Sequence, residues 1–194
     1  MISRKQIDYA LSRLFKGKAF IIFGPRQSGK TTFVEQMLAK LDKKTLYLNG
    51  DDADVRENLA KPNFTQIEQL LSDFEIIFID EAQRIVDVGL FIKIIVDRFK
   101  QVQVVATGSS AFELSEKINE PLTGRKYEMM LLPLSYAELV HDTDFLTEER
   151  LIEQRLIYGS YPEIINQPND AEEHLKLITD SYLYKDLFAL EDVK

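Results

Sequence analysis

One segment of the chain, GPRQSGKTT at residues 24–32, indicates a chemistry by the type and spacing of its residues. It follows an apolar run, Ala19–Phe23, and precedes a helical pattern that starts at Lys30. A strand, a GxxxxGK[ST] loop and a helix in this order are typical of a phosphate-binding loop. Backbone N–H groups at a helix N-terminus hold phosphate where glycine keeps side chains away, and Gly24 and Gly29 allow this approach. The segment therefore predicts a nucleoside triphosphate site.

Within this loop the charged and hydroxyl side chains have separate expected roles. The Lys30 ammonium group neutralises the β and γ phosphate oxygens, and the Thr31 hydroxyl is placed to bind Mg²⁺. The chain has no NKxD motif, which would read guanine, so adenine is the preferred base. The residues expected to bind the nucleotide are Gly24, Pro25, Arg26, Gln27, Ser28, Gly29, Lys30, Thr31 and Thr32.

A pair of carboxylates follows a second buried strand pattern about fifty residues downstream. In EIIFIDEAQ, residues 75–83, four apolar residues precede Asp80 and Glu81. Ligands of open α/β sheets bind at the carboxyl ends of the strands, so both carboxylates are expected beside the phosphate loop. Asp80 is expected to orient the Mg²⁺ shell next to Thr31, and Glu81 to polarise the water that attacks the γ-phosphorus. A strand that ends in Asp-Glu also occurs as a simple helix cap, which is the alternative reading of the pair alone.

Two further candidates follow in the sequence. The strand pattern at residues 102–106 ends in TGSS, where Thr107 or Ser109 is expected to contact the γ-phosphate or the attacking water; alternatively, Ser109 or Ser110 only caps the next helix. Arg125, in LTGR, is expected near the same sheet edge. It would stabilise charge at the γ-phosphate of its own or a neighbouring subunit, or form a structural ion pair with an acidic helix.

The composition indicates a globular chain with an uneven charge. The 194 residues are 45% hydrophobic and 29% charged, with a net charge of −8, and residues 131–194 hold 14 acidic against 5 basic residues. Such an acidic surface argues against a large nucleic-acid interface. No apolar run has the length of a membrane span. The chain contains no cysteine, which fits a cytoplasmic protein.

The hydrophobic patterns predict an α/β fold followed by helices. Apolar runs of strand length alternate with amphipathic helical patterns, which is typical of a parallel sheet between helices. From residue 133 onward only helical patterns follow, so we expect an ATPase core at residues 1–132 and a helical region at 133–194. Strands are expected at residues 19–23, 45–49, 76–79, 102–106 and 127–132, and helices at 2–15, 30–40, 51–60, 64–71, 90–100, 111–118, 136–140, 148–158 and 171–190.

Six blocks in sequence order, GPRQSGKTT, IIFIDEAQ, VVATGSSAFEL, LTGR, LPLSYAEL and YGSYPE, resemble prokaryotic AAA-type ATPases that join such a core to a C-terminal domain of unknown function. The resemblance implies a P-loop NTPase with a five-stranded parallel sheet of order 5-1-4-3-2, ATP and Mg²⁺ as ligands, and hydrolysis as the activity. It implies that residues 24–32 are the Walker A loop, that Asp80 and Glu81 are the Walker B pair, that residues 107–110 are the sensor region, and that Arg125 is the arginine of the GR motif.

The resemblance also shapes the expected function. Members of this family continue well beyond the segment at residues 182–187, so the chain resembles a truncated member with an incomplete helical region. The expected function is Mg²⁺-dependent ATP hydrolysis that moves this region, with Glu81, Lys30, Arg125 and Ser109 as catalytic residues. The alternative is an ATP-binding switch or scaffold with negligible turnover. A homo-oligomer and an unidentified protein partner are both compatible with the sequence.

Overall fold

The computed structural model describes residues 2–61, 63–109 and 111–180. These residues divide into two compact units. One consists of residues 5–131, and the other joins residues 2–4 to the chain from Leu132 onward. All the strands and the predicted nucleotide site lie in the first unit.

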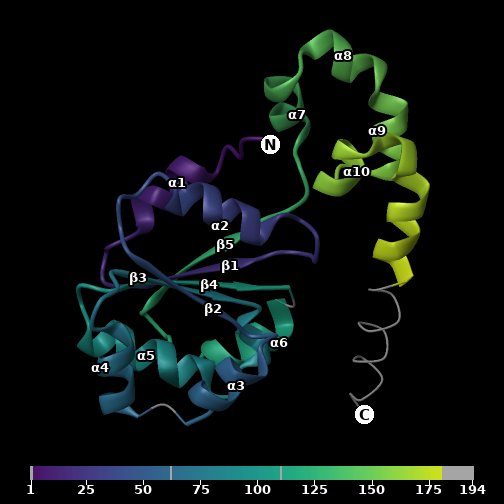
Figure 1. Ribbon diagram of the computed structural model, residues 1–194. Coiled ribbons are helices and arrows are strands. Elements are labelled where there is room, and N and C mark those ends of the chain that lie inside the picture. The colour runs from purple at the N-terminus through teal and green to yellow at the C-terminus, as the bar shows by residue number, and fades with distance from the viewer. Residues whose placement is uncertain (1, 62, 110, 181–194) are drawn as a thin grey trace. The chain divides into compact units, whose positions relative to one another are not determined.

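The first unit is built on a five-stranded parallel sheet (Figure 1). Its strand order is β2-β3-β4-β1-β5, which is the predicted order 5-1-4-3-2 read from the other edge. The three inner strands are buried along their whole length, as expected for apolar strands covered on both faces. The strands are β1 (Ala19–Phe23), β2 (Thr45–Asn49), β3 (Ile76–Asp80), β4 (Gln103–Gly108) and β5 (Lys126–Met130).

Helices cover both faces of this sheet, so the fold has three layers. Figure 1 shows α1 and α2 on one face and α3 to α6 on the other. Alternate residues of β1 serve the two cores: Ala19, Ile21 and Phe23 face α3 to α6, and Phe20 and Ile22 face α1 and α2. The helical elements are α1 (Ile7–Arg13), α2 (Lys30–Leu38), α3 (Ala53–Leu59), α4 (Phe64–Leu71), η1 (Ala82–Arg84), α5 (Val88–Arg98) and α6 (Ala111–Ile118).

Several predicted boundaries were wrong by a few residues. The helix expected over residues 2–15 is the shorter α1, because the chain turns before Ile7 and Arg4 belongs to the other unit. The buried Arg4 guanidinium donates a hydrogen bond to the Leu132 carbonyl oxygen and lies 3.6 Å from the Glu138 carboxylate. These contacts hold Arg4 in the second unit, so the residues before Ile7 do not continue α1.

The second unit is helical, as predicted, but more finely divided. Ser135 and Glu138 form a capping box at the start of α7. The single helix predicted over residues 148–158 is two helices joined at Leu151, because Asp144 caps an earlier start. Residues 171–180 are helical, and the rest of the helix expected up to residue 190 lies outside the described residues. The elements with assigned bounds are α7 (Tyr136–Asp142), α8 (Phe145–Arg150), α9 (Ile152–Tyr158), α10 (Pro162–Asn166) and η2 (Pro168–Asp170).

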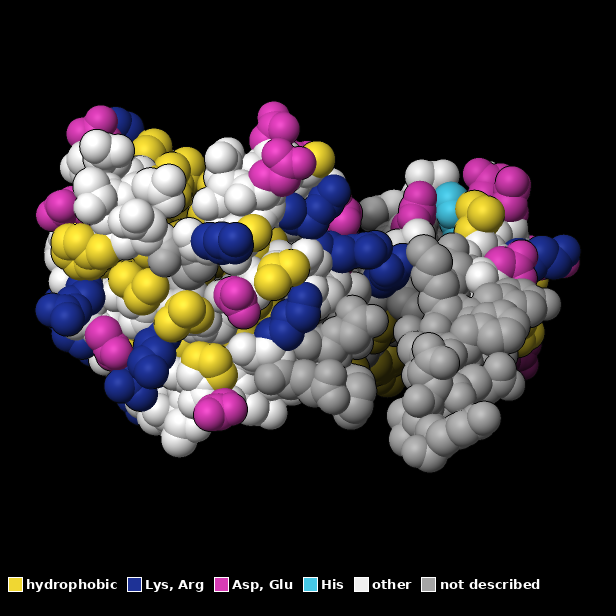
Figure 2. Space-filling view, turned by 90° about the horizontal axis from the view of Figure 1, so that it is seen from below, with side chains coloured by type: hydrophobic (Ala, Val, Ile, Leu, Met, Phe, Trp, Pro, Cys, Tyr) yellow, Lys and Arg dark blue, Asp and Glu magenta, His cyan; other side chains and the backbone are white. Residues whose placement is uncertain are grey.

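The face of the first unit that α3 to α6 cover carries side chains of both charges. In Figure 2, Lys and Arg side chains lie interspersed with Asp, Glu and apolar side chains on this face. Among the described residues, no helix is both long enough and apolar enough to cross a membrane.

Candidate functional site

The phosphate loop joins the carboxyl end of β1 to α2, as its sequence predicts. Gly29, the N-cap residue of α2, adopts a left-handed conformation with φ of 87° and has no side chain that could cap the first turn. The N–H groups of this turn are therefore available to an anion. A Cβ atom on Gly24 would lie 2.1 Å from the Leu131 carbonyl oxygen, so only glycine fits where the loop leaves the sheet. These features fit a triphosphate.

Lys30 lies folded into this loop. Its Nζ atom donates hydrogen bonds to the carbonyl oxygens of Gly24, at 2.9 Å, and Pro25, at 2.8 Å, and the residue is only 5% exposed. Burial lowers the pKa of Lys30, and the carboxylates of Glu81 and Asp80 partly offset this shift. The ammonium group thus lies inside the loop, where phosphate oxygens can replace the two carbonyl acceptors.

Asp80 is the point at which four elements of the sheet and loop meet. Its Oδ2 atom accepts hydrogen bonds from the Thr31 hydroxyl at 2.7 Å and the Tyr47 hydroxyl at 3.3 Å. Its Oδ1 atom accepts one from the Thr107 hydroxyl and one from the Glu81 backbone N–H group at 3.1 Å. The two predicted metal-binding residues, Thr31 and Asp80, are therefore in direct contact.

This donor set fits Mg²⁺ with a few protein ligands. Within the described residues, no group of three or more His, Asp or Glu side chains could hold a metal ion alone. Mg²⁺ is usually held by one or two protein oxygens together with phosphate and water, which is what Thr31 and Asp80 would provide. The Thr31 hydroxyl would bind the ion directly, and Asp80 would orient its water shell.

Glu81 begins a tight turn next to Asp80. Its backbone is left-handed, with φ of 47° and ψ of 44°, which is uncommon for a residue with a side chain. Its Oε2 atom accepts hydrogen bonds from the Ser109 hydroxyl, at 3.0 Å, and from the Gln83 amide. The structure thus brings Glu81 and Ser109 together, as the order of the strands leads one to expect. The alternative that Ser110 caps the next helix falls on a residue outside the described ones.

Three residues near this site were missed by the sequence analysis. Tyr47 lies on the edge strand β2, and burial and the nearby Asp80 raise its pKa to about 12. The N–H group of Gly50 donates to the Asp80 carbonyl oxygen at 2.8 Å, and a Cβ atom on Gly50 would lie 2.3 Å from the Glu81 carbonyl oxygen. Gln83 is buried and bonded to Glu81. The Gln of DEAQ was the only one of these with a sequence signal, since it lies two residues after Glu81, the expected base.

The prediction that Arg125 lies near the phosphate-binding edge was wrong. Arg125 directly precedes β5, and its carbonyl oxygen accepts a hydrogen bond from Ala19 N–H at the start of β1. Because β1 and β5 are parallel and Ala19 pairs with Lys126, Arg125 lies at the opposite edge from Gly24, six residue steps or about 20 Å away along the strand direction. Its guanidinium group pairs with Asp97 of α5 at 2.8 Å, which is the structural alternative that the sequence left open. Arg125 does not reach the phosphate loop of its own chain.

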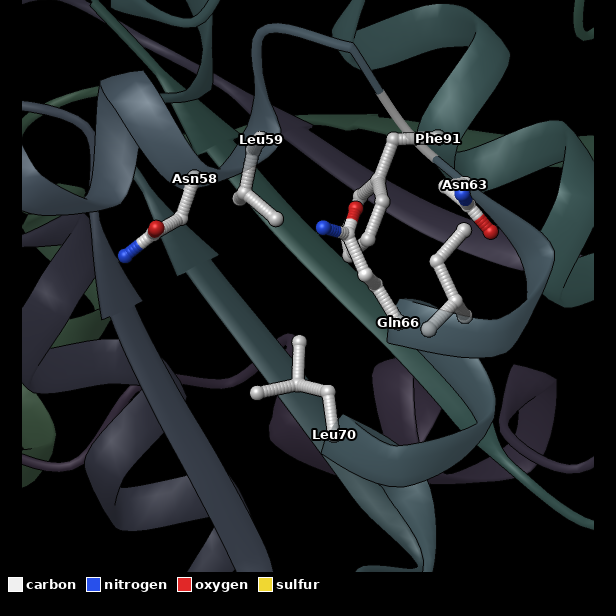
Figure 3. Close-up of a pocket in the computed structure, with 7 residues that line it drawn as sticks. Asn58, Leu59, Asn63, Gln66, Leu70 and Phe91 are labelled. Carbon is white, nitrogen blue, oxygen red and sulfur yellow. The ribbon is translucent and has the colours of Figure 1, made fainter.

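A separate pocket of about 210 Å³ lies between α3, α4 and α5 (Figure 3). Leu59, Leu70 and Phe91 form its apolar wall, and the side-chain amide of Asn58 points away from them. None of its residues belongs to the phosphate loop, to the Asp80–Glu81 pair or to the residues bonded to them. This pocket is therefore separate from the candidate nucleotide site. The lining residues are Asn58, Leu59, Asn63, Gln66, Ile67, Leu70 and Phe91.

Comparisons with known proteins agree with this geometry. A family model described as an AAA domain matches residues 16–140. An uncharacterized protein of Methanocaldococcus jannaschii is 26% identical over 94% of this chain and 44% of its own length. An uncharacterized protein of Haemophilus influenzae is 29% identical over 100% of this chain and 52% of its own length. The chain thus spans about half the length of the curated relatives it matches.

A solved structure, the Walker-type ATPase of Pyrococcus abyssi, is similar in fold, with a TM-score of 0.64. It covers 99% of this chain and 76% of its own, at 12% sequence identity. At this identity the likeness shows the fold alone. The fold of the first unit is that of a P-loop NTPase.

Proposed function

Because the chain belongs to the AAA domain family, we propose that it binds ATP with Mg²⁺ and hydrolyses the terminal phosphate. The observation that carries this proposal is the 2.7 Å hydrogen bond from the Thr31 hydroxyl to the Asp80 carboxylate. It joins the phosphate loop to the carboxylate pair across 49 residues of sequence, at one edge of the sheet. Glu81, the expected base, is the next residue.

The residues of the loop provide binding and charge. The free N–H groups at the start of α2 hold the phosphates, and the Lys30 ammonium group exchanges its two carbonyl acceptors for phosphate oxygens. When bound, Mg²⁺ neutralises charge on the phosphate oxygens. Thr31 and Asp80 would hold the ion and its water at this position. Other P-loop enzymes use the same division of tasks.

Glu81 supplies the acid–base chemistry. Its carboxylate accepts a proton from a water molecule as that water attacks the γ-phosphorus. The bond from the γ-phosphorus to the β–γ bridging oxygen breaks, ADP leaves with that oxygen, and the proton then passes to solvent. The turn that begins at Glu81 directs it differently from Asp80, so one carboxylate serves the metal and the other the water. Adenine as the preferred base and the cytoplasmic location stay predictions.

Glu81→Gln tests the proposal, because it keeps the shape of the side chain and removes the base. We expect phosphate release to fall about 100-fold or more, which is the usual contribution of a general base, while the affinity for ATP and Mg²⁺ is retained. Glu57→Gln, a change of an exposed glutamate on α3, is the matched control and should leave both unchanged. Full turnover in Glu81→Gln would refute Glu81 as the base.

One observation favours the alternative of an ATP-binding switch with negligible turnover. The Glu81 carboxylate is already held by Ser109 and Gln83, so it must give up part of this contact to receive a water. The same assay separates the two functions. ATP binding with phosphate release at background in the unaltered chain, at every protein concentration, would establish the switch.

Arg125 enters the proposal only through a second copy of the chain. Its side chain is 38% exposed at the edge opposite its own loop, so it can contact the nucleotide of a neighbour in a homo-oligomer. We further propose a core at residues 1–132 whose nucleotide state moves the helical region at 133–194, with a protein partner as the target. The relatives extend well beyond the matched length, so the activity of a whole protein of this kind is also a proposal.

A further inference from the structure

We propose that Gln83 is a positioning residue that couples Ser109 to the Glu81 carboxylate, so that the base is released when the γ-phosphate engages Ser109. This inference rests on the proposed function and adds regulation to the same site. It is carried by three connected polar groups on two different strand ends.

The three groups form a closed ring of hydrogen bonds. The Nε2 atom of Gln83 donates one proton to Glu81 Oε2 and the other to Ser109 Oγ, at 2.9 Å. The Ser109 hydroxyl in turn donates to the same Glu81 Oε2 atom, at 3.0 Å. An ionised carboxylate only accepts hydrogen bonds, so the amide must present its N–H groups to this ring. Both protons of the amide are therefore used at the candidate site.

The other end of the same amide shows that packing alone does not explain this side chain. Gln83 is only 4% exposed, and its Oε1 atom has no hydrogen-bond donor among the described residues. A buried acceptor without a donor is costly, and such groups in a folded protein need an explanation. The contacts with Glu81 and Ser109 provide this explanation. They direct the two N–H groups of the amide toward the candidate site and leave its Oε1 atom without a donor.

The backbone around Gln83 is fixed in the same orientation. The Lys117 ammonium group donates to the carbonyl oxygens of Gln83 and Ile85, and thus ties η1 to α6. Gly108 provides the room, because a Cβ atom there would lie 3.0 Å from Gln83 Oε1 and 2.6 Å from a Leu114 methyl carbon. The Gln83 amide is thus held beside the end of β4, next to the candidate nucleotide site.

This ring has a consequence for hydrolysis. If the Ser109 hydroxyl turns to donate to a γ-phosphate oxygen, Glu81 loses one of its two side-chain donors and gains a free lone pair for the attacking water. Gln83 continues to donate to Glu81 Oε2 and keeps the carboxylate in place. The base would then become available when the phosphate is present, through a change of one hydroxyl direction.

Gln83→Met tests this role, because it keeps a similar shape and removes both N–H groups. Partners that orient a reacting group typically affect activity 10- to 100-fold, so we expect turnover to fall by about this factor. The dissociation constant for ATP should change less than about twofold, because no contact to the nucleotide is removed. The double variant Gln83→Met, Ser109→Ala should be no slower than the slower single variant, because both act through one ring.

Gln103→Met is the matched control for the loss of a buried glutamine. Gln103 is as buried as Gln83, and its Nε2 atom donates to the carbonyl oxygens of Lys18, at 3.0 Å, and Val104, at 2.7 Å, at the opposite edge of the sheet. Gln103→Met should therefore lower the melting temperature and leave turnover per folded molecule unchanged. Equal loss of turnover in both variants, or unchanged turnover in Gln83→Met, would overturn the coupling.

A measurement without turnover separates this inference from the proposed function. The two side-chain amide protons of Gln83 should give two NMR signals that are protected from exchange with water. A nonhydrolysable ATP analogue with Mg²⁺ should shift the signal of the proton that is hydrogen-bonded to Ser109. Glu81→Gln should shift the signal of the proton that is hydrogen-bonded to Glu81. If both signals exchange like those of an exposed glutamine, the inference fails. If phosphate release is at background while this pattern is seen, hydrolysis fails and the coupling stands.

Discussion

Gly24→Ala is the most direct test of whether the phosphate loop is packed as the structure shows. The added Cβ atom would lie 2.1 Å from the Leu131 carbonyl oxygen and 3.1 Å from its carbon atom. Both belong to the backbone, and the Leu131 N–H group is itself bonded to the Phe23 carbonyl oxygen at 2.7 Å. No side chain can turn aside to relieve the contact. The loop must instead move away from the end of β5 by about 1 Å, given ordinary contact distances.

The size of the effect follows from this displacement. Overpacking of this kind costs about 1–3 kcal/mol of unfolding free energy. For a chain of this length, that corresponds to a melting temperature lower by about 3–10 °C. A displacement of about 1 Å in a site that positions a reacting group costs on the order of 100-fold in rate. ATP affinity should also fall, because the N–H groups of the loop no longer converge.

The assay compares this variant with Gly17→Ala. Gly17 lies shortly before β1, at its other end, with φ of 71° and open space around the added atom, so it carries only a strain of about 1–2 kcal/mol. Thermal unfolding without nucleotide and an ATP titration are measured for both variants. We expect both to lose stability and only Gly24→Ala to lose ATP affinity. Normal ATP affinity in Gly24→Ala, or equal losses in both, would refute the packing argument.

Three further predictions concern charge. If Arg125 acts on a neighbouring chain, phosphate release per chain should rise with protein concentration, and Arg125→Ala should remove this rise; a rate independent of concentration would contradict it. Burial lowers the pKa of Lys30, so ATP affinity should fall as the pH rises through that lowered pKa, at a lower pH than for an ordinary lysine. Lys30→Arg should show no such fall in the same pH titration of ATP affinity, and an equal fall in both proteins would contradict this. Glu138→Ala removes the carboxylate 3.6 Å from the buried Arg4 guanidinium and should cost about 3–5 kcal/mol in chemical denaturation; a loss no larger than in Glu149→Ala, an exposed control, would contradict this.

Much of the fold followed from local patterns. The three buried strands are apolar runs, and the motif of the phosphate loop lies within nine consecutive residues. Both could therefore be predicted without knowledge of distant contacts. The contact of Thr31 with Asp80 also followed, because parallel strands end at one edge. These predictions use rules that hold wherever the residues occur.

Contacts that depend on a particular turn could not be predicted in this way. The left-handed backbone at Glu81 directs the following residues back toward β4, so that Gln83 meets Ser109. Tyr47 reaches Asp80 only because the edge strand β2 pairs with β3 in the observed register. A polar residue two positions after a base, or on an edge strand, has many possible neighbours, and hydrophobic periodicity does not choose among them.

The misplacement of Arg125 has a different cause, because the sequence contained the means to avoid it. Arg125 stands immediately before a strand-like run, and residues before a strand lie at the amino edge of a parallel sheet. Phosphate-binding loops lie at the carboxyl edge. The strand directions alone therefore separate Arg125 from Gly24 by the length of β5, and the pair with Asp97 is what this edge provides. It follows that any role for Arg125 at a γ-phosphate requires the nucleotide of a second chain, so the two halves of the proposed site can be tested by mixing Arg125→Ala with Lys30→Ala. If each variant is inactive alone, a mixture should recover activity only where the intact arginine of one chain meets the intact loop of the other.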